Sequence, residues 1–210
     1  MTARRTFASL ALMALVVLLP AVARSDASQE VQDLYRTSYR EEAKGKATAA
    51  LDAMKKIQTK SGATYFVSAR QGWLAYLAGR FGESEAAYRA AIKSKPDSIE
   101  ARLGLTLPLL AQKKWRPLEK ACRHVLKLDA QNAVARARLA HAYYSIGNYP
   151  DSATVYRKLV RDCPAELDHQ TGLGWALARM GRAGEAKKIF AEVLAVSPDN
   201  PNARQGMALP

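Results

Sequence analysis

Apolar residues recur along the chain at intervals that fit one face of an α-helix. They stand three residues apart in pairs such as Tyr88 with Ala91, and most places between them are small, polar or charged. The full set is Met54, Tyr88, Cys122, Tyr156 and Phe190, followed three places on by Ile57, Ala91, Val125, Leu159 and Val193. Residues three or four apart share one side of a helix, so the spacing predicts helices with a buried stripe.

The pattern repeats every 34 residues without gaps, which divides the chain into units 31–64, 65–98, 99–132, 133–166 and 167–200. The eighth place of every unit is small: Ser38, Gly72, Thr106, Ala140 and Gly174. The fifteenth place favours a turn after a helix C-terminus; it holds Gly45, Gly79, Lys113, Gly147 and Gly181. Pro96, Pro164 and Pro198 close three units, because proline cannot continue a helix. Each unit is therefore predicted to be two helices joined by a turn, stacked on its neighbours.

This pattern resembles the tetratricopeptide repeat family, and the resemblance covers the chain from about Val31 to Asn200. Besides the period, it rests on the small eighth and twentieth places, the closing prolines and an aromatic seventeenth place (Phe81, Trp115, Tyr149). The resemblance implies an all-α fold, namely a right-handed superhelical solenoid of tandem helix-turn-helix repeats.

Some parts depart from the pattern. Unit 31–64 has Gly62 at the place of the closing proline, so we interpret it as a degenerate or capping repeat. Pro108 lies inside the first helix of the third unit and is expected to kink or shorten that helix. Residues 201–210 begin a sixth first helix and are expected to form a C-terminal cap.

The N-terminus has the layout of a secretory signal peptide over residues 1–23, with Arg4 and Arg5 ahead of an apolar run. We expect cleavage after Ala23, a flexible lead over residues 24–30, and an exported, periplasmic protein. The alternative is an uncleaved anchor in the inner membrane, because the run approaches the length of a membrane span.

The net charge is +13, and it falls to +11 without Arg4 and Arg5. An exported chain seldom meets nucleic acid, so we expect no such partner. Acidic proteins, anionic envelope polymers and lipids stay open, as does a solvated basic surface without a ligand. Cys122 and Cys163 either form a disulfide or stay free as small apolar residues, and we favour the second.

Nothing in the sequence indicates catalysis. The histidines His124, His141 and His169 lie in three different units without metal-ligand spacing, and no phosphate loop or nucleophile motif is present. We therefore expect no metal, no cofactor and no catalytic residue. An enzyme would need His141 beside a carboxylate such as Glu42 or Asp168, which stand in other units.

In the tetratricopeptide family the first helix of each unit lines a concave groove. On that basis the predicted partner-binding residues are Tyr35, Tyr39, Arg70, Trp73, Tyr76, Arg138, His141, Tyr144, Trp175 and Arg179. Accessible aromatic rings are typical of binding hot spots, and arginines bind carboxylates. The asparagines of the family's carboxylate clamp are absent, so the clamp as a whole is not inferred. Packing of these rings in the core is the alternative interpretation.

The sequence thus predicts an exported scaffold or adaptor that binds a peptide segment of a partner protein and serves a cell-envelope complex. The alternative function is binding of an anionic envelope polymer or lipid through the basic outer face, which would depend strongly on salt.

Overall fold

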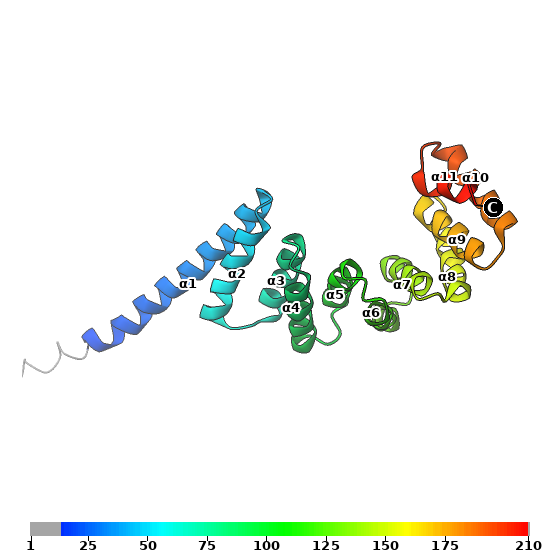
Figure 1. The fold of residues 1–210 in the computed structure, drawn as a ribbon. Helices are drawn as coiled ribbons and strands as arrows, with labels where there is room; N and C mark the ends of the chain where they lie inside the picture. Colours follow the sequence, from blue (N-terminus) through cyan, green and yellow to red (C-terminus); the bar gives the residue numbers. More distant parts are fainter. Residues whose placement is uncertain (1–13, 210) are drawn as a thin grey trace, which may run out of the picture.

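The computed structural model describes the backbone of residues 14–209 and the side chains of residues 28–209. Within this part of the chain, α-helices follow one another through short turns (Figure 1). They are α1 (Ala14–Ala43), α2 (Ala47–Ser61), α3 (Tyr65–Leu77), α4 (Phe81–Ser94), α5 (Ile99–Ala111), α6 (Trp115–Leu128), α7 (Ala133–Ser145), α8 (Tyr149–Asp162), α9 (Leu167–Arg179), α10 (Ala183–Val196) and α11 (Pro201–Met207). From α3 onward the first helices begin 34 residues apart, as do all second helices from α2 to α10. The predicted all-α solenoid of tandem helix-turn-helix units is confirmed.

The helices form two layers. α3 contacts α5, α5 contacts α7 and α7 contacts α9, so the first helices make one continuous layer. Each second helix from α2 to α8 packs against the first helix of its own unit and that of the next unit. Figure 1 shows the stack as an open arc, with the N-terminal arm (α1, α2) and the C-terminal arm (α9 to α11) rising on the same side.

The turn between the two helices of each unit has the backbone conformation that its glycine predicts. Gly45, Gly79, Gly147 and Gly181 have φ between 71° and 82°. Glycine adopts this left-handed region without steric cost, whereas a residue with a Cβ atom is strained there. Lys113 occupies the equivalent place in the third unit with φ of 54°.

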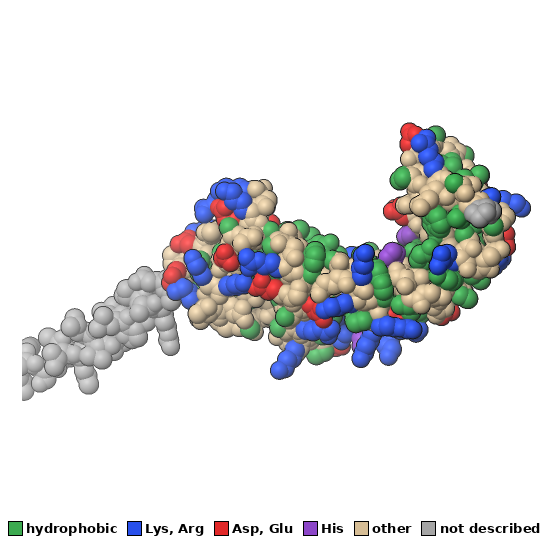
Figure 2. Space-filling view, viewed as in Figure 1, with side chains coloured by type: hydrophobic (Ala, Val, Ile, Leu, Met, Phe, Trp, Pro, Cys, Tyr) green, Lys and Arg blue, Asp and Glu red, His purple; other side chains and the backbone are tan. Residues whose placement is uncertain are grey.

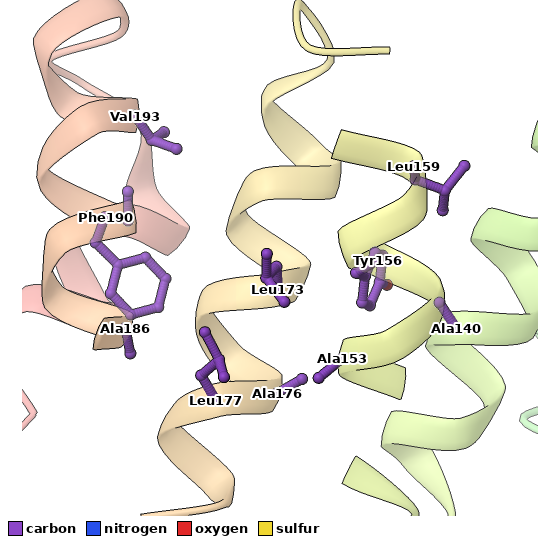
Figure 3. Packing of buried hydrophobic residues seen from close by; sticks show 11 residues of the cluster. Ala140, Ala153, Tyr156, Leu159, Leu173, Ala176, Leu177, Ala186, Phe190 and Val193 are labelled. Carbon is purple, nitrogen blue, oxygen red and sulfur yellow. The ribbon is translucent and has the colours of Figure 1, made fainter. Parts of the chain in front are cut away.

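The buried stripe holds the layers together. Met54, Ile57, Cys122, Phe190 and Val193 are fully buried, and the helices meet through small residues between them. Figure 3 shows Ala153 of α8 and Ala176 of α9 facing each other, with Phe190 of α10 turned toward α9. All five small residues at the eighth place are buried, as their close-packing role requires.

The first helix of the first unit differs from the expectation. α1 has 30 residues and includes residues 24–30; the flexible lead expected there stays a prediction. No glycine or proline stands between Ala21 and Ala43 to end the helix. The expected signal peptide begins in residues 1–13, which lie outside the described residues. None of the helices among the described residues has the length and hydropathy of a membrane span.

Pro108 does not shorten its helix, which was one of the two effects expected of it. α5 has 13 residues, as do α3, α7 and α9. Beyond the proline the helical bonding resumes, since the Gln112 backbone N–H donates to the Pro108 carbonyl at 3.0 Å. Both cysteines are free: Cys122 is buried in the core and Cys163 is half-buried at the C-terminal end of α8.

Candidate functional site

The residues predicted to bind a partner differ in their accessibility. Tyr39 and Trp73 are 50% and 38% exposed, and His141 and Arg179 are exposed as well. The half-buried members are Tyr35, Arg70, Tyr76, Arg138, Tyr144 and Trp175. Most of them line or border two clefts on the first-helix layer, which we call the N-terminal cleft and the C-terminal cleft. Figure 2 shows the molecule hollowed between its two arms, where histidine side chains are visible.

Glu42 organises the side chains around the N-terminal cleft. Arg70 donates to the Glu42 carboxylate at 2.7 Å and to the Ser38 hydroxyl at 3.2 Å, and the Trp73 indole N–H donates to Glu42 at 2.7 Å. The Arg70 guanidinium also lies 3.7 Å from the centre of the Tyr39 ring. The Arg70 side chain is only 10% exposed, so this charge-assisted pair fixes the rings before any partner arrives.

The N-terminal cleft has a volume of about 330 Å³. It is lined by Tyr39, Tyr65, Phe66, Ala69, Arg70, Trp73, Tyr88 and Glu100. Tyr76 stacks on Trp73 beside it, with ring centres 6.1 Å apart. The Tyr65 hydroxyl donates to the Glu100 carboxylate at 2.8 Å, so the polar groups of this cleft are largely paired with one another.

Arg138 lies near the middle of the solenoid and has no carboxylate partner among the described residues. Its Nη1 donates to the Leu103 carbonyl at 3.0 Å and to the Thr106 hydroxyl. Burial lowers the pKa of its guanidinium. The remaining N–H groups find no protein acceptor within the described part of the chain, which suits an anionic group of a ligand.

The C-terminal cleft has a volume of about 520 Å³. It is lined by His141, Tyr144, Tyr156, Asp168, Thr171, Gly172, Trp175, Asn202 and Gln205. The predicted residues His141, Tyr144 and Trp175 therefore come together from two units. The ring centre of Trp175 lies 5.5 Å from that of the buried Phe190, and this packing fixes the Trp175 side chain in the wall of the cleft.

His141 and Asp168 line this same cleft, although they stand in different units of the sequence. Desolvation lowers the pKa of the His141 imidazole. No hydrogen bond joins it to a described carboxylate, and the Thr171 hydroxyl donates to the Leu167 carbonyl. The side chains that the structure describes contain no group of three potential metal ligands.

Besides Tyr76 and Arg138, two further predicted residues, Tyr35 and Arg179, line neither cleft. Tyr35 packs against the buried cluster that α2 and α3 form around Met54 and Leu74, and its ring centre lies 5.8 Å from that of Phe66, edge to face. Arg179 donates to the Tyr149 hydroxyl at 3.0 and 3.1 Å, near the turn between α7 and α8. These two side chains therefore contact neighbouring units rather than line either cleft.

Several lining residues were not among the predicted ones. Phe66, Glu100, Asp168 and Asn202 all hold the second place of a unit, a place that the family resemblance puts on the groove face. Tyr88 and Tyr156 belong to the buried stripe of the second helices, and only the structure reveals that they also reach the first-helix layer.

The comparisons with known proteins agree with this architecture. The sequence profile described as Tetratricopeptide repeat matches residues 69–115 and 137–201, together more than half of the chain. No curated protein sequence matches the chain.

Solved structures match the fold at low sequence identity. A tetratricopeptide repeat protein from Parabacteroides merdae has a TM-score of 0.79 and 17% identity, over 86% of this chain and 72% of that one. A MamA fragment from Desulfovibrio magneticus has a TM-score of 0.76 and 17% identity, over 82% of this chain and 97% of that one. YrrB, described as a TPR protein with an unusual peptide-binding site, has a TM-score of 0.74 and 12% identity, over 84% and 91% of the two chains.

Proposed function

Because the chain belongs to the tetratricopeptide repeat family, we propose that it is a non-catalytic interaction scaffold that binds a peptide segment of a partner protein across its two clefts. The segment runs along the first-helix layer from Trp73 in the N-terminal cleft to Trp175 in the C-terminal cleft. Helix-pair repeats offer an extended surface of this kind because each unit contacts only its neighbours and repeats the same face.

The observation that carries this proposal is the accessibility of aromatic rings in preformed clefts. Trp73 is 38% exposed although it is held by Glu42, and Trp175 lies in the wall of a cleft of about 520 Å³. Rigid, partly accessible aromatic side chains bind partners at low entropic cost. The peptide-binding site named for YrrB concerns that protein, but it is consistent with peptide binding on this fold.

The cellular setting is also part of the proposal. The signal-peptide pattern at residues 1–23 supports export to the periplasm. There the scaffold would serve the assembly or maintenance of a cell-envelope complex, with a protein and not nucleic acid as its partner.

Affinity capture tests the proposed function. The processed chain, its Trp73→Ala/Trp175→Ala variant and a Leu128→Ala/Val196→Ala control would be used to capture proteins from envelope extract at low and moderate salt. Leu128 and Val196 are exposed near the ends of α6 and α10, outside both clefts. A defined protein retained by the wild type and the control, and lost by the tryptophan variant, is the expected result.

A second candidate function has an observation of its own. A cleft of about 710 Å³ between α4, α5 and α6 is lined by six basic or histidine side chains. They are Arg89, Lys93, Arg102, Arg116, Lys120 and His124. If the tryptophan variant captures as much as the wild type, and capture is lost at moderate salt, the function lies on this outer face, with an anionic polymer or lipid as ligand.

A further inference from the structure

A tyrosine from the outer helix layer reaches the C-terminal cleft through a gap in the inner layer. Tyr156 of α8 is 8% exposed, yet it lines the cleft. A Cβ atom at Gly172 of α9 would lie 2.5 Å from the Tyr156 ζ carbon, so only glycine leaves room for the ring there. Figure 3 shows Tyr156 on the side of α8 that is nearer to α9, across from Leu173. We call this arrangement the tyrosine window.

The Tyr156 hydroxyl has no partner in the part of the protein that the structure describes. None of the described residues forms a hydrogen bond with it, although nearly all of the side chain is buried. Burial raises the pKa of Tyr156 to about 12, so the hydroxyl stays protonated and neutral. The hydroxyl itself is accessible from the cleft and is not sealed in the core, so it can form a hydrogen bond with water or with a group that enters the cleft.

The same arrangement occurs 68 residues earlier in the chain. A Cβ at Gly104 would lie 2.1 Å from Tyr88, which lines the N-terminal cleft. In each cleft the tyrosine has an aromatic ring from the ninth place of its own unit and a carboxylate from the second place of the next. These are Trp73, Tyr88 and Glu100 in one cleft and His141, Tyr156 and Asp168 in the other.

The two carboxylates differ in what they bind. Glu100 accepts the Tyr65 hydroxyl at 2.8 Å. Asp168, in contrast, forms no hydrogen bond or ion pair with any residue that the structure describes, and it is exposed. The C-terminal cleft is thus the one whose carboxylate is available to a ligand.

The charge of the C-terminal cleft is opposite to that of the chain. Its lining contains Asp168 and the amides of Asn202 and Gln205, but no lysine or arginine among the described residues. The chain as a whole carries 32 Lys and Arg against 19 Asp and Glu. The faces of tryptophan and tyrosine rings attract cations, and here Tyr144 and Trp175 stand beside an available carboxylate.

We propose that the C-terminal cleft binds the ammonium or guanidinium group of a lysine or arginine side chain from the bound peptide. Asp168 pairs with the cation, Tyr144 and Trp175 contact it with their rings, and the Tyr156 hydroxyl accepts one of its N–H groups. This inference rests on the proposed function, and it specifies the partner: the segment contains a basic residue whose place sets its register in the clefts.

Selection from a peptide library tests the inference. Random 12-residue peptides displayed on phage would be selected on the full chain, on Asp168→Asn, on Trp73→Ala/Trp175→Ala and on Glu192→Gln. The last variant removes a carboxylate from an exposed place on α10, outside the cleft, as a matched control. Peptides selected by the wild type and the control are expected to share a lysine or arginine at one position, which peptides selected by Asp168→Asn lack.

Charge reversal then tests the pairing directly. For a selected peptide, replacing the shared basic residue by methionine should weaken binding about tenfold, as for a partly desolvated ion pair. Asp168→Lys should bind the original peptide worse still, and it should recover affinity for a peptide with glutamate at that position. Tyr156→Phe should weaken binding of the basic peptide while leaving the thermal midpoint close to that of the wild type.

Two outcomes would count against these ideas in different ways. If no peptide is selected by the wild type and lost by the tryptophan variant, the proposed function is wrong and this inference with it. If such peptides are selected but share no basic residue, and bind Asp168→Asn as well as the wild type, only the cation site is overturned.

Discussion

At the scale of single residues, glycine serves two opposite purposes in the helices. Gly172 and Gly104 leave room for the rings of Tyr156 and Tyr88, because any Cβ at these places would lie closer than 3 Å to a ring carbon. Gly184 lies in a second helix, and no atom comes within 4 Å of the position that a Cβ would take there. The missing side chain of Gly184 therefore has no packing role.

Gly172→Ala is expected to destabilise the chain by about 1–3 kcal/mol, since the buried ring has to move. Gly184→Ala should instead stabilise it by up to about 0.5 kcal/mol, because Gly184 lies in the first turn of α10, where the difference in helix propensity is smaller than in a helix interior. Urea unfolding followed by circular dichroism would measure both. Equal effects of the two substitutions would mean that the tyrosine window is not tightly packed.

The sequence predicts the buried place of Tyr156 but not its second role. Its spacing with Leu159 assigns it to the stripe of a helix, and it is indeed 8% exposed. Whether the Tyr156 hydroxyl reaches the cleft depends on Gly172, which stands sixteen residues later, in the next unit. A glycine there resembles any other small helix-packing residue until the two helices are placed together.

At the scale of elements, the same left-handed backbone conformation joins the two helices of every unit, and four of the five turns have glycine at that place. Gly45, Gly79, Gly147 and Gly181 adopt positive φ freely, whereas Lys113 adopts the same region with a Cβ atom. The glycine pattern predicted these turns. The repeat could not predict the 30 residues of α1, because that helix begins before the first unit and no glycine or proline interrupts it after Ala21.

Lys113→Gly is expected to raise the free energy of unfolding by about 0.5–1 kcal/mol, because it removes the strain of a left-handed Cβ. Gly147→Ala, the reverse change in the next unit, should lower it by a similar amount. Thermal unfolding of the two variants provides the measurement. A loss of stability in Lys113→Gly would indicate that the lysine side chain contributes more than the strain that it imposes.

At the scale of the whole molecule, each unit is stabilised by packing against its neighbours, so the terminal units depend on the elements that cap them. α11 stands in the place of a sixth first helix, where Gly206 lies against the buried ring of Phe190 and Ala203 is fully buried. The repeat pattern predicts a cap at residues 201–210. It does not predict that Asn202 and Gln205 of this helix also form part of a cleft.

Deletion of residues 201–210 should expose Phe190, and the loss of buried apolar surface should lower the stability of the last unit by about 2 kcal/mol. Amide hydrogen exchange should then accelerate in α9 and α10 while α3 and α4 keep their protection, because units contact only their neighbours. Uniform acceleration along the chain would instead show that the solenoid unfolds as one cooperative block.

The recurrence of the tyrosine window after 68 residues has a consequence for valency. A solenoid lengthened by further copies of residues 133–200 would present the window at every second unit along its inner layer. Basic side chains spaced to match along one ligand would then bind as a chelate, since each contact after the first becomes intramolecular. The spacing of windows would act as a ruler, selecting ligands by the interval between their charges as well as by the charges themselves.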